Sequence, residues 1–110
     1  MSSAIASASN SFNINLHDSI EYITGGIKST VLLKHSKSQY NLFCLTAGTE
    51  IKEHTSDCDA VISVVEGRGQ LTLAEEEIML VPGVFVLIAA NTPHTVKAEE
   101  NLAFMLILSE

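Results

Sequence analysis

The residues of this chain best suited to chemistry are four histidines, two of which stand at a specific spacing from glycines. His54 follows Gly48 after five residues, and His94 follows the apolar run and the turn that come after Gly83. A neutral imidazole binds a divalent metal, or accepts a hydrogen bond, through one ring nitrogen. We therefore predict that these two side chains form a metal site or the polar end of a ligand cavity. The other two histidines lie near polar ends of predicted strands and are expected at the surface: His17 and His35.

The number of ligands decides between these two kinds of site. A catalytic divalent metal is held by three or four protein ligands and keeps one position open. His54 and His94 supply two, and Ser56 is a poor substitute for a third. Other donors follow His54 in a polar turn: Asp57, Cys58 and Asp59. A thiolate ligand would favour zinc. The residues leave open both a metal site and a metal-free cavity lined by hydrogen-bonded imidazoles.

The elements that must position these residues are strands. From Phe12 onward, short runs rich in Val, Ile, Leu, Phe and Thr alternate with Gly, Pro, Asn or charged clusters, which is typical of an all-β protein. No connection is long enough for a helical crossover, so we expect antiparallel strands in a sandwich or barrel. Nine strands are predicted: 20–24, 30–35, 40–47, 60–66, 69–74, 77–81, 84–89, 94–98 and 102–108.

Two of these strands lack a polar face. Alternation along a half-buried strand leaves one face polar, but both faces of Ala60–Val65 are mostly apolar, and Leu102–Leu108 has no polar face. Such strands are covered twice, and a chain of this length has little left to supply the second cover. We therefore predict a homodimer formed through these two strands.

Composition limits the remaining possibilities. The 110 residues are 46% hydrophobic and 17% charged, which predicts one compact domain over residues 12–110 and a disordered tail over 1–11. The net charge of -7, with no basic stripe, argues against nucleic acid and anionic membranes as partners. No run approaches the length of a membrane span, and the two cysteines are expected as free thiols, so we predict a cytoplasmic protein. A core of this size requires no cofactor for folding.

The two segments that carry the histidines resemble the two motifs of the cupin superfamily. In the first motif Gly48, His54 and Gly67 match, and in the second Gly83 and His94 match. The motifs cover residues 48–98, and the strand pattern extends over residues 12–108. The resemblance implies a single-domain cupin double-stranded β-helix, or jelly-roll barrel, with both histidines pointing into it.

The chain also departs from these motifs. Ser56 stands where the family has a second histidine, and Ala60 stands where it has a glutamate, so two of the three usual ligands from the first motif are missing. In the second motif Asn91 replaces a glycine, which is a mild change because Asn tolerates a left-handed backbone. Its proline and terminal asparagine positions hold Ala89 and Ala98.

The superfamily contains isomerases, oxygenases, decarboxylases, storage proteins and sensors, so the fold alone does not assign a function. The first hypothesis is a barrel with a degenerate metal site and little or no catalysis, which binds a small organic molecule in a partly apolar cavity. The residues expected to line this cavity are His54, Ser56, Cys58, Ile62, Val64 and His94. The second hypothesis is a metal-dependent enzyme of the dioxygenase or isomerase type that uses His54 and His94 to hold Zn, Mn, Fe or Ni.

Overall fold

The computed structural model of the chain describes residues 11–110, so nearly all of the predicted tail, residues 1–11, lies outside the described residues. The described part is built from strands, with one short helix, α1 (Leu16–Ser19). None of its helices is long and apolar enough to cross a membrane. The strands are β1 (Ile27–His35), β2 (Ser38–Leu45), β3 (Glu50–His54), β4 (Asp59–Glu66), β5 (Gly69–Leu73), β6 (Glu76–Leu80), β7 (Phe85–Ile88), β8 (His94–Ala98) and β9 (Leu102–Ser109).

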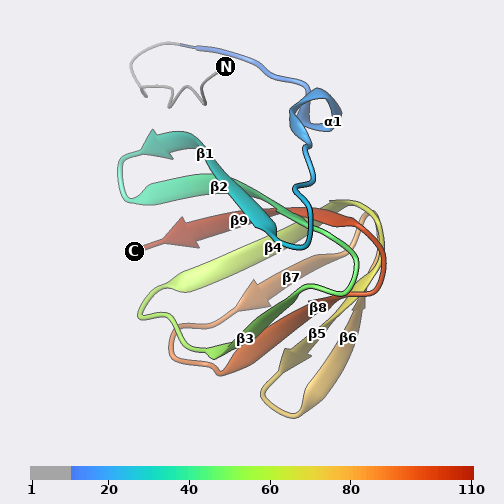
Figure 1. Cartoon of the computed structure of the whole chain (residues 1–110). Helices are drawn as coiled ribbons and strands as arrows, with labels where there is room; N and C mark the ends of the chain where they lie inside the picture. Colours follow the sequence, from blue (N-terminus) through green and yellow to red (C-terminus); the bar gives the residue numbers. More distant parts are fainter. Residues whose placement is uncertain (1–10) are drawn as a thin grey trace.

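The strands form two separately hydrogen-bonded sheets that face each other (Figure 1). The five-stranded sheet has the order β1-β2-β9-β4-β7, and the four-stranded sheet has the order β3-β8-β5-β6. Every pairing is antiparallel, and neighbours such as β2 and β9 are far apart in sequence. This is the jelly-roll arrangement, and the predicted all-β fold is confirmed.

The predicted strands differ from the observed ones by up to three residues at their ends, and one predicted strand and one observed strand have no counterpart. Residues 20–24 are not a strand, although they are rich in β-branched and aromatic residues, because Ile20 and Tyr22 pack on the outside of the five-stranded sheet instead of pairing with a neighbour. Conversely, β3 was not predicted because three of its five residues are charged. It forms because it pairs with β8 on one side and turns Ile51 toward the core, while its charged residues face water.

The main core lies between the two sheets. Alternate residues of each strand point inward, and the largest buried side chains, among them Phe104, come from both sheets. Phe43 of β2 stacks on Phe104 of β9, with ring centroids 5.5 Å apart. Ile62 and Val64 of β4 belong to this same cluster, with 1% and 5% of their surface exposed.

A second, smaller cluster covers part of the outer face of the five-stranded sheet. Ala103 and its buried neighbours on β2 are packed under Ile20 and Tyr22, which precede β1 in the same chain. The Tyr22 hydroxyl donates a hydrogen bond of 2.8 Å to a carboxylate oxygen of Glu66, and burial together with this bond raises the pKa of Tyr22. The expectation that the chain has little left to cover this face is therefore wrong for this half of the sheet. Val65 also lies in the cluster, so it is not a free interface residue.

Candidate functional site

One end of the jelly roll carries the residues that could bind a ligand or take part in a reaction. The turns β1–β2, β3–β4, β5–β6 and β7–β8 and the end of β9 all lie there, toward the left and bottom of Figure 1. We call this end the mouth. The glycines of the motif resemblance lie in turns at the opposite end: Gly48, Gly67 and Gly83, all with positive φ.

His54 and His94 are cross-strand neighbours at the mouth. His54 ends β3, His94 begins β8, and the two residues are paired directly opposite each other. Their ring centroids are 4.2 Å apart, with the ring planes at 60°. His94 shares the inward parity of Val96 and is 7% exposed, whereas His54 sits on the edge strand and is exposed. The sheet thus brings together two residues that are forty positions apart in sequence.

Hydrogen bonds to the backbone determine which nitrogen of each ring remains available. His54 Nδ1 lies 3.1 Å from the carbonyl oxygen of Lys52, and His94 Nδ1 lies 3.0 Å from that of Thr92. A carbonyl oxygen only accepts, so Nδ1 must carry the proton in both rings. The neutral rings therefore keep a lone pair on Nε2, and both offer an acceptor, or a metal ligand, at that atom.

The five-stranded sheet contributes polar groups to the same end. Asn41 is 4% exposed, and it pairs with Leu106 on the inward face of the sheet. Its side-chain oxygen accepts a hydrogen bond of 2.9 Å from the amide of Gln39, and its own amide donates to the Leu106 carbonyl at 3.4 Å. Asn41 and His94 are the buried polar residues of the described chain. Burying a polar group is costly unless it is satisfied, so both positions are unusual for a core.

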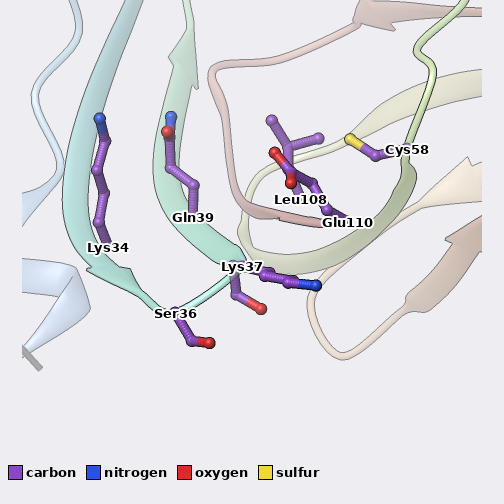
Figure 2. Close-up of a pocket in the computed structure, with 8 residues that line it drawn as sticks. Lys34, Ser36, Lys37, Gln39, Cys58, Leu108 and Glu110 are labelled. Carbon is purple, nitrogen blue, oxygen red and sulfur yellow. The ribbon is translucent and has the colours of Figure 1, made fainter.

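A hollow of about 280 Å³ opens at this end of the inward face. Figure 2 shows Lys34 of β1 and Gln39 of β2 extending side by side, with Leu108 and Cys58 across from them. Lys34 is paired with Gln39, and Gln39 with Leu108, so the three share one face of the sheet. The full lining is Lys34, Ser36, Lys37, Ser38, Gln39, Cys58, Leu108 and Glu110.

The residues expected to complete a metal site do not assemble around the histidines. Within residues 11–110, no group of three or more His, Cys, Asp or Glu side chains is placed to hold a metal. Asp59 instead accepts a hydrogen bond of 2.9 Å from the Ala90 backbone N–H, Asp57 is exposed, and Cys58 lines the hollow. The donor set of two imidazoles falls short of the three protein ligands of a catalytic site. The described residues therefore do not fit the divalent metal that the fold often holds.

The other predicted cavity residues occupy different layers of the structure. The Ser56 hydroxyl lies 3.4 Å from the Cys58 sulfur and also accepts from the Cys58 N–H, so the two stabilise the turn after β3. Ile62 and Val64 are packed in the core below, and their part in a ligand site remains a prediction. Cys58 is the member of the set that lines the hollow. Both cysteines are free.

Sequence reasoning missed Lys34, Gln39 and Asn41. One signal for Asn41 was available: it has the same parity as Phe43 and Leu45 in an apolar run, so it is a polar residue at an inward position. Lys34 and Gln39 gave no such signal, because charged and amide residues near a hairpin turn are usually solvated. Only the pairing of β1 with β2, and of β2 with β9, places them on the inward face.

Comparisons with known proteins agree with this fold. The chain is similar to a conserved protein of unknown function from Streptococcus pyogenes, with 23% identity, a TM-score of 0.83, and 100% of this chain and 96% of the other covered. A cupin superfamily protein from Desulfitobacterium hafniense is 20% identical, with a TM-score of 0.82 and coverage of 91% and 92%. KdgF from Halomonas sp. is 22% identical, with a TM-score of 0.76 and coverage of 90% and 94%.

These solved structures support the fold and leave the activity open, and no curated protein matches the chain. The model of the cupin domain matches residues 41–109, from the buried Asn41 to the end of β9. This range contains both histidines, their two strands and the three motif glycines. With its jelly roll and its paired histidines at the mouth, the chain belongs to the cupin domain family.

Proposed function

We propose that this protein binds a small organic molecule at the mouth of the barrel through His54 and His94, and that it does so without a catalytic metal. The observation that carries this proposal is that Nδ1 of each ring lies within hydrogen-bond distance of a backbone carbonyl oxygen, which assigns the tautomer. Both Nδ1 atoms are engaged with backbone carbonyls, so two neighbouring Nε2 atoms remain as acceptors. An acceptor next to another acceptor favours an occupant that can donate, such as a molecule with hydroxyl groups.

The surroundings support a ligand that is polar at its ends and apolar between them. Asn41 and Gln39 lie on the inward face of the five-stranded sheet, and Leu108 gives the hollow lined by Gln39 an apolar wall. A volume of about 280 Å³ is at the lower end of the usual range of ligand sites, roughly 300–1,000 Å³. We therefore expect a small metabolite.

The alternative is a metal-dependent enzyme of the dioxygenase or isomerase type. It requires a third protein ligand beside His54 and His94, and the described residues supply none. Metal analysis of untagged protein separates the two functions. We expect well below one metal ion per chain, whereas one tightly held ion per chain would favour the enzyme.

The tautomer itself is testable by long-range ¹H–¹⁵N NMR at about pH 8.5, where imidazoles are neutral. We expect His54 and His94 to show the proton on Nδ1 and an unprotonated Nε2. His17 and His35, which are exposed, serve as internal references and should show the average of exchanging tautomers. A proton on Nε2 of His54 or His94 would remove the observation on which the proposed function rests.

We further propose that a second copy of the chain covers the bare half of the five-stranded sheet. On the outer face of β4 and β7, Val61 is paired with Leu87, and Phe85 and Leu87 are 68% and 59% exposed. The outward residues of this half-face from Ser63 of β4 to Ile107 of β9 carry no charge. Because the chain carries a net charge of -7, an uncharged face is where a second copy meets the least local repulsion and gains from covering apolar surface.

Leu87→Lys is expected to give a monomer. It places a like charge on each side of a two-fold contact, which is strongly unfavourable when desolvated. Met79→Lys is the matched control, because Met79 is 42% exposed on the outer face of β6 in the other sheet. Light scattering at micromolar concentration should give a dimer for the unmodified protein and the control. A monomeric unmodified protein contradicts this proposal.

A further inference from the structure

A row of four cross-strand neighbours crosses the four-stranded sheet at the mouth. His54 is paired with His94, and His94 is paired with Leu73. Leu73 is in turn paired with Glu76, the first residue of β6. Residues directly opposite each other in antiparallel strands point to the same face of a sheet, and Leu73 packs against the core between the sheets. The row therefore places a carboxylate on the same inward side as the two imidazoles, with one leucine between them.

The row has the dimensions of a small molecule. Directly opposed Cα atoms of antiparallel strands are about 4.5–5.5 Å apart, so the Cα atoms of His94 and Glu76, which are two pairs apart, are separated by about 10 Å. The Glu76 side chain is exposed, so its carboxylate can turn toward Leu73. One extended molecule can therefore contact an imidazole, the leucine and the carboxylate together.

Both ends of this row have unused hydrogen-bonding capacity. His94 is 7% exposed and its Nδ1 is bonded to the Thr92 carbonyl, but within residues 11–110 nothing is bonded to its Nε2. A polar side chain that is buried to this extent normally has its acceptors satisfied, so the open Nε2 indicates a place for a donor of a ligand. At the other end, Glu76 is in neither of the two ion pairs that the same residues contain. Its carboxylate is available to a cation.

From this row we propose that the ligands of the site are short aliphatic amino alcohols, an inference that rests on the proposed function. The hydroxyl group of the ligand donates to Nε2 of the paired imidazoles, its carbon chain lies on Leu73, and its ammonium group pairs with Glu76. The net charge of -7 adds a long-range attraction for a cationic ligand.

The two ends of the row select against simpler molecules. A carboxylate ligand is repelled by Glu76 and has no proton to donate to the imidazole lone pairs. A simple alcohol satisfies an imidazole but leaves Glu76 without a partner. A simple alkylamine can pair with either end of the row but not with both. A molecule with a hydroxyl group at one end and an ammonium group at the other satisfies both ends.

The test compares aminopentanol with pentanol and with pentylamine, each of which lacks one of the two end groups. Binding is followed by NMR shifts of the His54 and His94 ring nitrogens at about pH 8.5, where imidazoles are neutral and alkylammonium groups, like lysine side chains, are charged. At low salt we expect aminopentanol to bind about three- to fivefold more tightly than either analogue, which is the effect typical of an exposed ion pair.

Two neighbouring glutamates provide a matched pair of variants. Glu76→Gln keeps the size of the side chain and removes its charge, so it should abolish the preference for aminopentanol over pentanol. Glu77→Gln is the control, because Glu77 is also exposed but pairs with Thr72 on the outward face of the same strands. The two variants have the same net charge, so a difference between them reports the position of the carboxylate. Equal melting temperatures of the two variants exclude misfolding.

The outcomes separate this inference from the proposed function. If aminopentanol and pentanol shift the imidazoles with equal affinity, or if Glu76→Gln keeps the preference, the amino alcohol class is wrong and the proposed function stands. A loss of preference in Glu77→Gln as large as that in Glu76→Gln would also overturn the role of the row. If none of the three compounds shifts the ring nitrogens, the amino alcohol class is overturned, and the proton positions of the two rings and the metal content still decide the proposed function.

Discussion

Gly67→Ala is expected to be the most destabilising single substitution at the motif glycines. A Cβ at this position would overlap the carbonyl oxygen of Asn101 and lie 2.8 Å from both its carbonyl carbon and the Cα of Leu102. The backbone there also has a φ of +93°, which an alanine rarely adopts. The clash involves main chain that begins β9, so a side-chain rotation cannot relieve it. We expect a loss of at least about 4 kcal/mol, a large share of the roughly 5–15 kcal/mol that holds a domain folded.

Gly83→Ala is the matched control for this prediction. Gly83 has a similar φ of +95°, but a Cβ there meets no atom within 4 Å. The control isolates backbone strain, which costs about 1–3 kcal/mol. Urea denaturation of the two variants should therefore differ in midpoint, with Gly67→Ala the less stable or unfolded in buffer. Equal losses would show that β9 moves away and that the close approach of the turn to Asn101 is not needed.

The second large effect is expected from restoring the ligands that the family motif has and this chain lacks. Ser56→His combined with Ala60→Glu should create a site that binds zinc or manganese. Ala60 is 3% exposed and pairs with Leu108 and Ile88, so the new carboxylate is buried among apolar residues. Without metal, an unpaired buried carboxylate should destabilise the fold by about 3 kcal/mol, which corresponds to roughly 12 °C or more in Tm.

Added metal should reverse this loss in the double variant alone. Binding to the folded state stabilises it by about 4 kcal/mol at a metal concentration a thousand times Kd. Ser56→His by itself changes a half-buried turn residue and serves as the control, with little change in Tm in the absence of metal. In the unmodified protein, chelator should leave Tm unchanged. A drop of many degrees on chelation would mean that a native third ligand exists near His54 and His94.

The sequence predicts a strand correctly where the composition of the segment itself favours a strand. The run Leu102–Leu108 predicts a strand because it is short, apolar and preceded by a polar turn, and a strand is observed at Leu102–Ser109. β3 was missed because its composition is that of a loop, and its extended conformation depends on β8 as a partner. Ile20–Thr24 shows the reverse case: its composition favours a strand, but its apolar side chains are used to cover Ala103.

The sequence by itself determined the fold family and identified His54 and His94 as candidate site residues. Glycine turns, strand periodicity and the spacing of these histidines are local properties of the chain. Only the tertiary structure decided that these rings lie 4.2 Å apart, that both hold their proton on Nδ1, and that Asp59 is used in a turn. It also decided that Lys34 and Gln39 face inward. The physical reason is that a side chain's environment at the mouth is set by strand register between segments far apart in sequence, and a shift of one residue would turn each of these groups to the opposite face.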